Sequence, residues 1–188
     1  MKGGLTMLTN ASLSKCEITW MAMSGVMDRN GWEQTRHKRS ATRVFYNGCG
    51  SISTGFMSDV AKDRRAKKLK VCGDHVAVPQ TFSWFVYENW DKYSNFTDFQ
   101  EVWTMGSQIA YVSTPENNML KEWTDRKNAG IVYCSIVDRY KNSGIRLYKE
   151  NYGYTWDYPF DLPDGFLEFE AKVLLQEIPV NLQEKLVP

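Results

Sequence analysis

The stretch between residues 58 and 123 constrains the fold most, because helical and strand-like patterns alternate along it. Its helical patterns place apolar residues three and four positions apart, as in Phe82, Phe85 and Val86. The expected elements are a helix from Ser58, a strand at 69–72, helices at 81–90 and from Thr97, and a strand at 108–112. This order predicts a mixed α+β fold.

Two of the expected helices carry signals at their starts. Thr97 precedes Gln100 by three residues, which is the spacing of a capping box. For a further helix, the sequence predicts Thr114 as N-cap and Pro115 at the first helical position, with Glu116 in the first turn. We expect this further helix to end near residues 128–130.

Helical phase separates two adjacent asparagines in the helix that starts at Thr114. Asn117 lies about 60° from Leu120 around the helix axis, whereas Asn118 lies nearly opposite. We therefore expect Asn117 to point inward and Asn118 to point away. The expected buried side consists of Met119, Leu120 and Trp123.

The two ends of the chain have weaker patterns. Residues 1–60 have no clean period, and turn signals at 30–31, 47–48 and 50–51 predict short pieces there. Strand-like runs follow at 130–137 and 144–148. The alternation in residues 165–174 predicts a half-exposed strand.

Length and composition narrow the class of protein. A chain of 188 residues with 43% hydrophobic content can bury a core. It has no run of about 18 apolar residues and no basic start followed by an apolar stretch, so we expect a folded cytoplasmic protein with no membrane partner. Its four cysteines form no C-x-x-C pair, which excludes a zinc knuckle built from local spacing.

The net charge of +1 conceals an asymmetry along the chain. Residues 1–73 contain 13 Lys and Arg against 5 Asp and Glu, whereas residues 74–188 contain 10 against 17. Two dense basic clusters account for much of the excess, and phosphate binding would explain them. Solvated helix faces are the alternative explanation. The first cluster consists of Arg36, His37, Lys38 and Arg39, and the second of Lys62, Arg64, Arg65, Lys67, Lys68 and Lys70.

Asp74 and His75 directly follow the expected end of a strand at Gly73. Together with Asn117 they supply the groups that phosphodiester hydrolysis requires. These groups are a base that titrates near neutral pH and oxygen ligands for a hard divalent ion. The alternative is that Asp74 and His75 form a surface turn and Asn117 satisfies a helix end.

At these residues the sequence resembles the HNH, or ββα-metal, nucleases, and in particular the free-standing homing-type endonucleases of bacteriophages. The resemblance covers residues 68–123 in three stretches, which read KLKVCGDHVAVPQ, DKYSNFTDFQEVW and IAYVSTPENNMLKEW. It implies a ββα-metal core in which the long stretch after His75 is a helical insertion. The activity it implies is hydrolysis of double-stranded DNA to products with a 5′ phosphate and a 3′ hydroxyl.

The same resemblance implies a role for each site residue. Asp74 and Asn117 would bind one Mg²⁺ or Mn²⁺ ion, and His75 would be the general base. A loop asparagine, Asn95 or Asn89, would orient His75. The basic residues that would contact DNA are Arg36, Lys38, Arg39, Arg64, Arg65, Lys67, Lys68 and Lys70.

These expectations divide the chain into a basic DNA-contacting segment (1–67), an HNH-like core (68–127) and a β-rich acidic segment (128–188). Two alternatives stay open. One is a non-catalytic DNA-binding phage accessory protein. The other is a PD-(D/E)-x-K nuclease that uses Asp164, Glu170 and Lys172, although only five residues separate Asp164 from Glu170, too few for the turn between its two strands.

Overall fold

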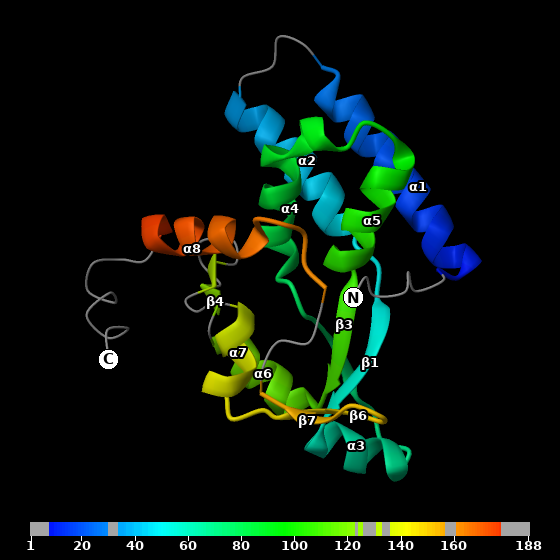
Figure 1. Ribbon diagram of the computed structural model, residues 1–188, viewed down its shortest axis with the longest axis vertical. Helices are drawn as coiled ribbons and strands as arrows, with labels where there is room; N and C mark the ends of the chain where they lie inside the picture. The colour runs from blue at the N-terminus through cyan, green and yellow to red at the C-terminus, as the bar shows by residue number, and fades with distance from the viewer. Residues whose placement is uncertain are drawn as a thin grey trace.

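The computed structural model describes residues 8–29, 34–122, 124–125, 131–132, 136–156 and 161–177. Within them the fold is mixed α+β, as the sequence predicts (Figure 1). The helices are α1 (Asn10–Met27), α2 (Gln34–Gly48), α3 (Asp59–Ala66), α4 (Pro79–Glu88), α5 (Phe96–Gly106), α6 (Thr114–Glu122), α7 (Ile136–Asn142) and α8 (Phe166–Glu177), with a short 3-10 helix, η1 (Trp90–Lys92). The strands are β1 (Ile52–Ser58), β2 (Cys72–His75), β3 (Gln108–Val112), β4 (Thr124–Asp125), β5 (Ile131–Val132), β6 (Leu147–Lys149) and β7 (Gly153–Thr155).

Five strands form one mixed sheet in the order β2-β3-β1-β6-β7. Strands β1 and β3 are parallel, and the other neighbouring pairs are antiparallel. The sheet takes β1 from segment 1–67, β2 and β3 from segment 68–127, and β6 and β7 from segment 128–188. All three segments of the predicted division therefore contribute to one sheet.

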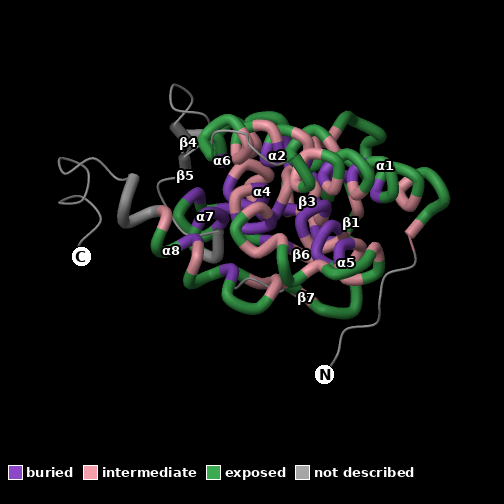
Figure 2. Tube along the Cα trace, turned by 90° about the horizontal axis from the view of Figure 1, so that it is seen from above, coloured by how far each residue is buried: buried purple, intermediate pink, exposed green. Residues whose placement is uncertain are grey.

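Aromatic side chains from several helices build the core. Phe45 of α2 stacks on Phe82 of α4 with ring centroids 5.9 Å apart, and Phe82 packs against Phe166 of α8 at 5.1 Å. Trp103 of α5 is also fully buried. Figure 2 shows the buried segments gathered in the middle of the molecule, where α4 and the sheet lie. The burial of Phe82, Phe85 and Val86 confirms the predicted inner face of α4.

The N-terminal region differs from the prediction of short pieces, because it forms two long helices and a strand. The Thr9 side chain caps α1 by accepting from the Ser12 backbone N–H. The buried stripe of α1 consists of Cys16, Thr19 and Met23, which have helical spacing but not the strong hydropathy that reveals a helix face. The turn signal at residues 47–48 does mark the end of α2.

Two predicted caps were each displaced. Asn95, not Thr97, caps α5 by accepting from the Asp98 N–H. Helix α6 begins with a capping box one residue before the predicted cap. The Ser113 N–H donates to Glu116 Oε2 at 2.7 Å, and the Glu116 N–H donates to Ser113 Oγ at 3.3 Å. The helix ends at Glu122, so the predicted end at residues 128–130 was wrong, because Thr124 and Asp125 already pair with β5 as strand β4.

The prediction of a strand at 165–174 was wrong, because this segment lies in α8. The buried and half-buried residues of this segment follow helical spacing; they are Phe166, Phe169, Glu170 and Val173. The alternation of apolar and charged residues that predicted a strand is therefore accidental. Within the run predicted as a strand at 130–137, Ile131 and Val132 form β5, whereas Ile136 and Val137 belong to α7. Within the run predicted at 144–148, Leu147 and Tyr148 lie in β6. Among the described residues, the helices are too short or too polar to cross a membrane.

Candidate functional site

Asp74 and His75 lie inside β2 and not beyond its end, contrary to the prediction that the strand stops at Gly73. Asp74 pairs with Ala110 of β3, and His75 pairs with Ile109. Because successive side chains of a strand point to opposite faces of the sheet, the Asp74 carboxylate and the His75 ring face different sides. Their hydrogen-bond partners also differ completely.

The Asp74 carboxylate is the centre of a nearly buried polar cluster. Its Oδ2 accepts from Arg139 Nη2 at 2.5 Å and from the Tyr140 hydroxyl at 2.6 Å, both on α7. The side chains of Asp74 and Arg139 are only 11% and 5% exposed. Burial and the Asp74 charge raise the pKa of Tyr140 well above its ordinary value, so its phenol stays protonated and donates. Arg139 Nη2 also donates to the His75 carbonyl at 2.8 Å.

The His75 ring is held by the backbone on the other face of the sheet. Its Nε2 lies 2.8 Å from the Gly50 carbonyl oxygen. A carbonyl only accepts, so Nε2 carries the proton and a neutral ring has its lone pair on Nδ1. Gly73 and Tyr111 share this face, and Arg65 of α3 lies over the Tyr111 ring at 5.4 Å. His75 therefore lies on the same face of the sheet as α3.

Asn117 is half-buried in the first turn and a half of α6, and Asn118 is exposed, which confirms their predicted phase. Leu120 is buried as expected, but Met119 is 42% exposed, and the side chain of Trp123 lies outside the described residues. The start of α6 reaches the Asp74 face of β2, where Thr114 Oγ1 lies 3.4 Å from Cys72 Sγ. The fold thus brings α6 to the side of Asp74 and leaves His75 on the other.

The cluster around Asp74 does not fit a divalent cation in this arrangement. A hard cation needs several oxygen ligands at about 2.0–2.6 Å. Here one carboxylate oxygen already accepts from a guanidinium and a phenol, and the charge of Arg139 repels a cation. Among the residues that the structure describes, no three His, Cys, Asp or Glu side chains group as metal ligands.

Neither asparagine predicted to orient His75 is hydrogen-bonded to it. Asn95 bonds to Asp98, and the Asn89 amide donates to the Phe85 carbonyl at 2.8 Å. The Gly50 carbonyl orients the ring in their place. No sequence signal could identify Gly50, because a backbone carbonyl is present at every position and only the fold selects one.

The second basic cluster forms one surface with the β6–β7 hairpin. We call residues 59–70 and 146–154 the α3–hairpin face; it contains eight Lys and Arg against three Asp and Glu. Lys62 Nζ lies 3.8 Å from the centroid of the Tyr148 ring, and the Arg146 guanidinium lies 4.0 Å from that of Tyr154. The contact of Lys62 with Tyr148 joins α3 to the hairpin, as does the 3.3 Å ion pair between Arg146 and Asp59. The exposed cations of the face are Lys62, Arg65, Lys67, Lys68, Lys70, Arg146 and Lys149, and Arg64 is half-buried.

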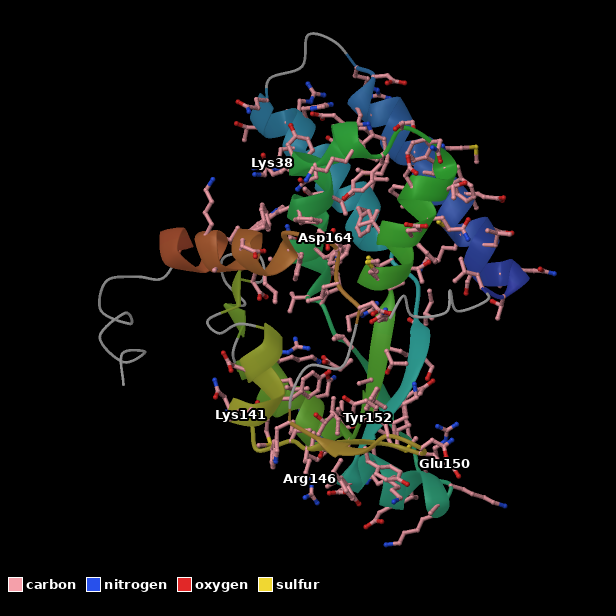
Figure 3. The ribbon with its side chains drawn as sticks, viewed as in Figure 1. Lys38, Lys141, Arg146, Glu150, Tyr152 and Asp164 are labelled. Carbon is pink, nitrogen blue, oxygen red and sulfur yellow. The ribbon has the colours of Figure 1, made fainter. Side chains whose placement is uncertain are left out.

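The first basic cluster lies at the opposite end of the molecule. Figure 3 places Lys38 of α2 near one end of the long axis and Arg146 and Tyr152 near the other. Lys38 forms an ion pair of 2.6 Å with Glu88. Arg36 and Arg39 are exposed on the same helix. The two clusters predicted to bind DNA together therefore do not form a common surface.

The rival E-x-K arrangement is not formed. Two residues apart on α8, Glu170 and Lys172 are separated by about 200° around the helix axis. Glu170 is 2% exposed, whereas Lys172 is exposed to solvent. The two side chains therefore cannot converge as neighbours on one face of a strand.

Comparison with known proteins found no match among protein-family models, curated proteins or solved structures.

Proposed function

We propose that this protein binds double-stranded DNA through the α3–hairpin face. The observation that carries the proposal is the convergence of cations from residues 62–70 and 146–149 on one exposed end of the fold. Each phosphate that a lysine or arginine neutralises releases counterions, so a dense group of exposed cations favours a nucleic-acid backbone. The three acids of the face leave it strongly positive.

The aromatic rings of this face support the same proposal. Tyr148 and Tyr154 pair across β6 and β7, and their rings contact Lys62 and Arg146. A side chain already held in place loses less conformational entropy when it binds a phosphate. Tyr152, 60% exposed on the hairpin turn, offers a further hydroxyl donor.

Fluorescence anisotropy with a labelled duplex tests this proposal. The variant Lys67→Glu/Lys68→Glu reverses two exposed charges of the face, and we expect its affinity to fall about tenfold or more. The matched control, Arg39→Glu/Arg43→Glu, reverses two exposed charges on α2 at the other end. We expect the control to change affinity less than about twofold. An equal loss of duplex affinity in both variants would contradict the proposal, because it would show that DNA does not bind preferentially at the α3–hairpin face.

Cleavage of the bound DNA is a second proposal, and it depends on His75. The specific observation in its favour is the His75 ring, which the Gly50 carbonyl holds through Nε2 on the face of the sheet where Arg65 lies over Tyr111. A histidine base can take a proton from water near neutral pH. The requirement for Mg²⁺ or Mn²⁺ belongs to this proposal, and we assign neither ligands nor a step to the ion, because Arg139 and Tyr140 already occupy Asp74 Oδ2.

Incubation with supercoiled plasmid tests cleavage separately from binding. We expect nicking with Mg²⁺ or Mn²⁺, none with EDTA, and a loss of about a hundredfold or more in His75→Ala. Retained duplex binding by His75→Ala would show that the variant is folded. Unchanged nicking by His75→Ala, or no nicking of any DNA by a protein that binds it, would reject the cleavage proposal and leave the binding proposal intact.

A further inference from the structure

A cavity of about 580 Å³ lies between α2, α4 and α8, away from the α3–hairpin face. Helix α4 packs against both α2 and α8. It turns Gln80, Trp84 and Glu88 towards the cavity at intervals of four residues, which places all three on one stripe of the helix. Helices α2 and α8 contribute Lys38, Arg39 and Lys172.

The core fixes the walls of this cavity. The side of α4 that faces away from it carries Phe82, which stacks on Phe45 of α2. Phe85 packs edge-on against Phe166 and Phe169 of α8, at 5.4 Å and 5.5 Å. Close-packed aromatic contacts resist displacement, so the three helices hold a fixed separation. A cavity with such walls is preformed for a ligand and does not have to open.

The lining of the cavity has an excess of positive charge. It contains three cations against one acid, and Glu88 already pairs with Lys38 at 2.6 Å. Arg39 and Lys172 are exposed, and among the described residues neither forms an ion pair. The cavity therefore offers two cations, one on each wall, to an anion placed between α2 and α8.

Trp84 gives the cavity a second chemical character. Its half-buried indole lies at the centre of the α4 stripe, where it presents a flat apolar surface beside the Gln80 amide. A planar ring with hydrogen-bonding edges suits this combination, because aromatic rings stack on indole and a primary amide both donates and accepts. The volume lies within the usual range of about 300–1,000 Å³ for small-molecule sites.

We propose that this cavity binds a nucleotide, with its base against Trp84 and its phosphates between Arg39 and Lys172. The proposal does not depend on binding of DNA at the α3–hairpin face, which lies at the other end of the molecule. A nucleotide would use both the two cations and the indole of Trp84. An inorganic anion would use the cations alone, and an uncharged ring would use the indole alone.

Isothermal titration calorimetry with ADP as the probe tests this site, with adenosine and pyrophosphate as comparison ligands. We expect saturable binding of ADP and affinities about tenfold or more weaker for each comparison ligand. Arg39→Glu/Lys172→Glu should weaken ADP binding about tenfold or more, and Trp84→Ala should do so as well. The control Lys67→Glu/Lys68→Glu reverses charges at the other end and should leave ADP affinity unchanged.

Three results would overturn the proposal. They are no saturable binding of ADP up to about 5 mM, unchanged affinity in Arg39→Glu/Lys172→Glu, and binding of pyrophosphate as tight as that of ADP. Circular dichroism verifies that each variant is folded. If the double variant does not fold, the exposed single change Lys172→Gln replaces it, with about a threefold loss expected and unchanged affinity as the contrary result.

Discussion

Arg139 and Asp74 form an ion pair with 2.5 Å between Nη2 and Oδ2, and both side chains are nearly buried. The pair joins α7 to β2 through two residues that are 65 positions apart in sequence. A buried carboxylate without its partner carries a large desolvation cost. The cluster of Asp74, Arg139 and Tyr140 therefore has a structural role that the sequence alone did not reveal.

We predict that Arg139→Ala lowers the free energy of unfolding by about 3–5 kcal/mol, because it leaves the Asp74 charge buried and unpaired. Tyr140→Phe removes one hydrogen bond to the same oxygen and should cost about 1–2 kcal/mol. Urea denaturation followed by circular dichroism measures both. A cost below about 1 kcal/mol for Arg139→Ala would contradict the buried pair.

We predict a decline of stability in alkali that depends on Cys49. Burial raises the pKa of its thiol from 9.0 to about 12. Because the pKa is higher in the folded state, the stabilising effect is complete below pH 9 and is lost as the pH rises towards 12. The loss is at most about 1.4 kcal/mol per pH unit for one thiol.

Urea denaturation between pH 8 and pH 11 measures this decline. Cys49→Ala should show a smaller decrease of unfolding free energy with pH than the unchanged protein. Cys72→Ala, at a half-exposed position, should retain the full decrease. Parallel curves for Cys49→Ala and the unchanged protein would show that the Cys49 thiol ionises equally well in both states.

Two glycine-to-alanine changes should have opposite effects on stability. A Cβ on Gly106 would lie 2.6 Å from the ring of the buried Phe82, so Gly106→Ala should destabilise by about 1–3 kcal/mol. Gly25 is an exposed position in α1 with no atom within 4 Å of an added Cβ, so Gly25→Ala should stabilise by about 0.5–1 kcal/mol. Thermal denaturation of the two variants compares them, and a gain of stability in Gly106→Ala would contradict the packing of α5 on α4.

The sequence predicted those elements whose own residues carry strong local signals. Helix α4 and the phase of Asn117 and Asn118 followed from helical spacing alone. Helix α1 was missed because its buried stripe contains threonine and cysteine. The alternation at 165–174 suggested a strand, but this segment lies in α8. Phe166 of α8 packs on Phe82 and Phe85, and such tertiary contacts are not visible in the local sequence.

The candidate site was less predictable than the fold. The sequence identified the basic residues of α3, but it could not show that Arg146 and Tyr154, about 80 residues later, lie beside this helix, where they contact Asp59 and Lys62. It also grouped Asp74 with His75, whereas pairing with β3 turns the two side chains to opposite faces. Contacts between residues far apart in the sequence decide both the composition of the α3–hairpin face and the directions of Asp74 and His75. No local sequence pattern predicts such contacts.

The salt dependence of duplex binding tests the central proposal most directly. For the unchanged protein and for Lys67→Glu/Lys68→Glu, the logarithm of the association constant is measured against the logarithm of the salt concentration. If the α3–hairpin face contacts phosphates, the slope of the variant should be smaller in magnitude by about 1.8, or about 0.9 for each lost phosphate contact. Equal slopes for the two proteins would contradict binding of DNA at this face.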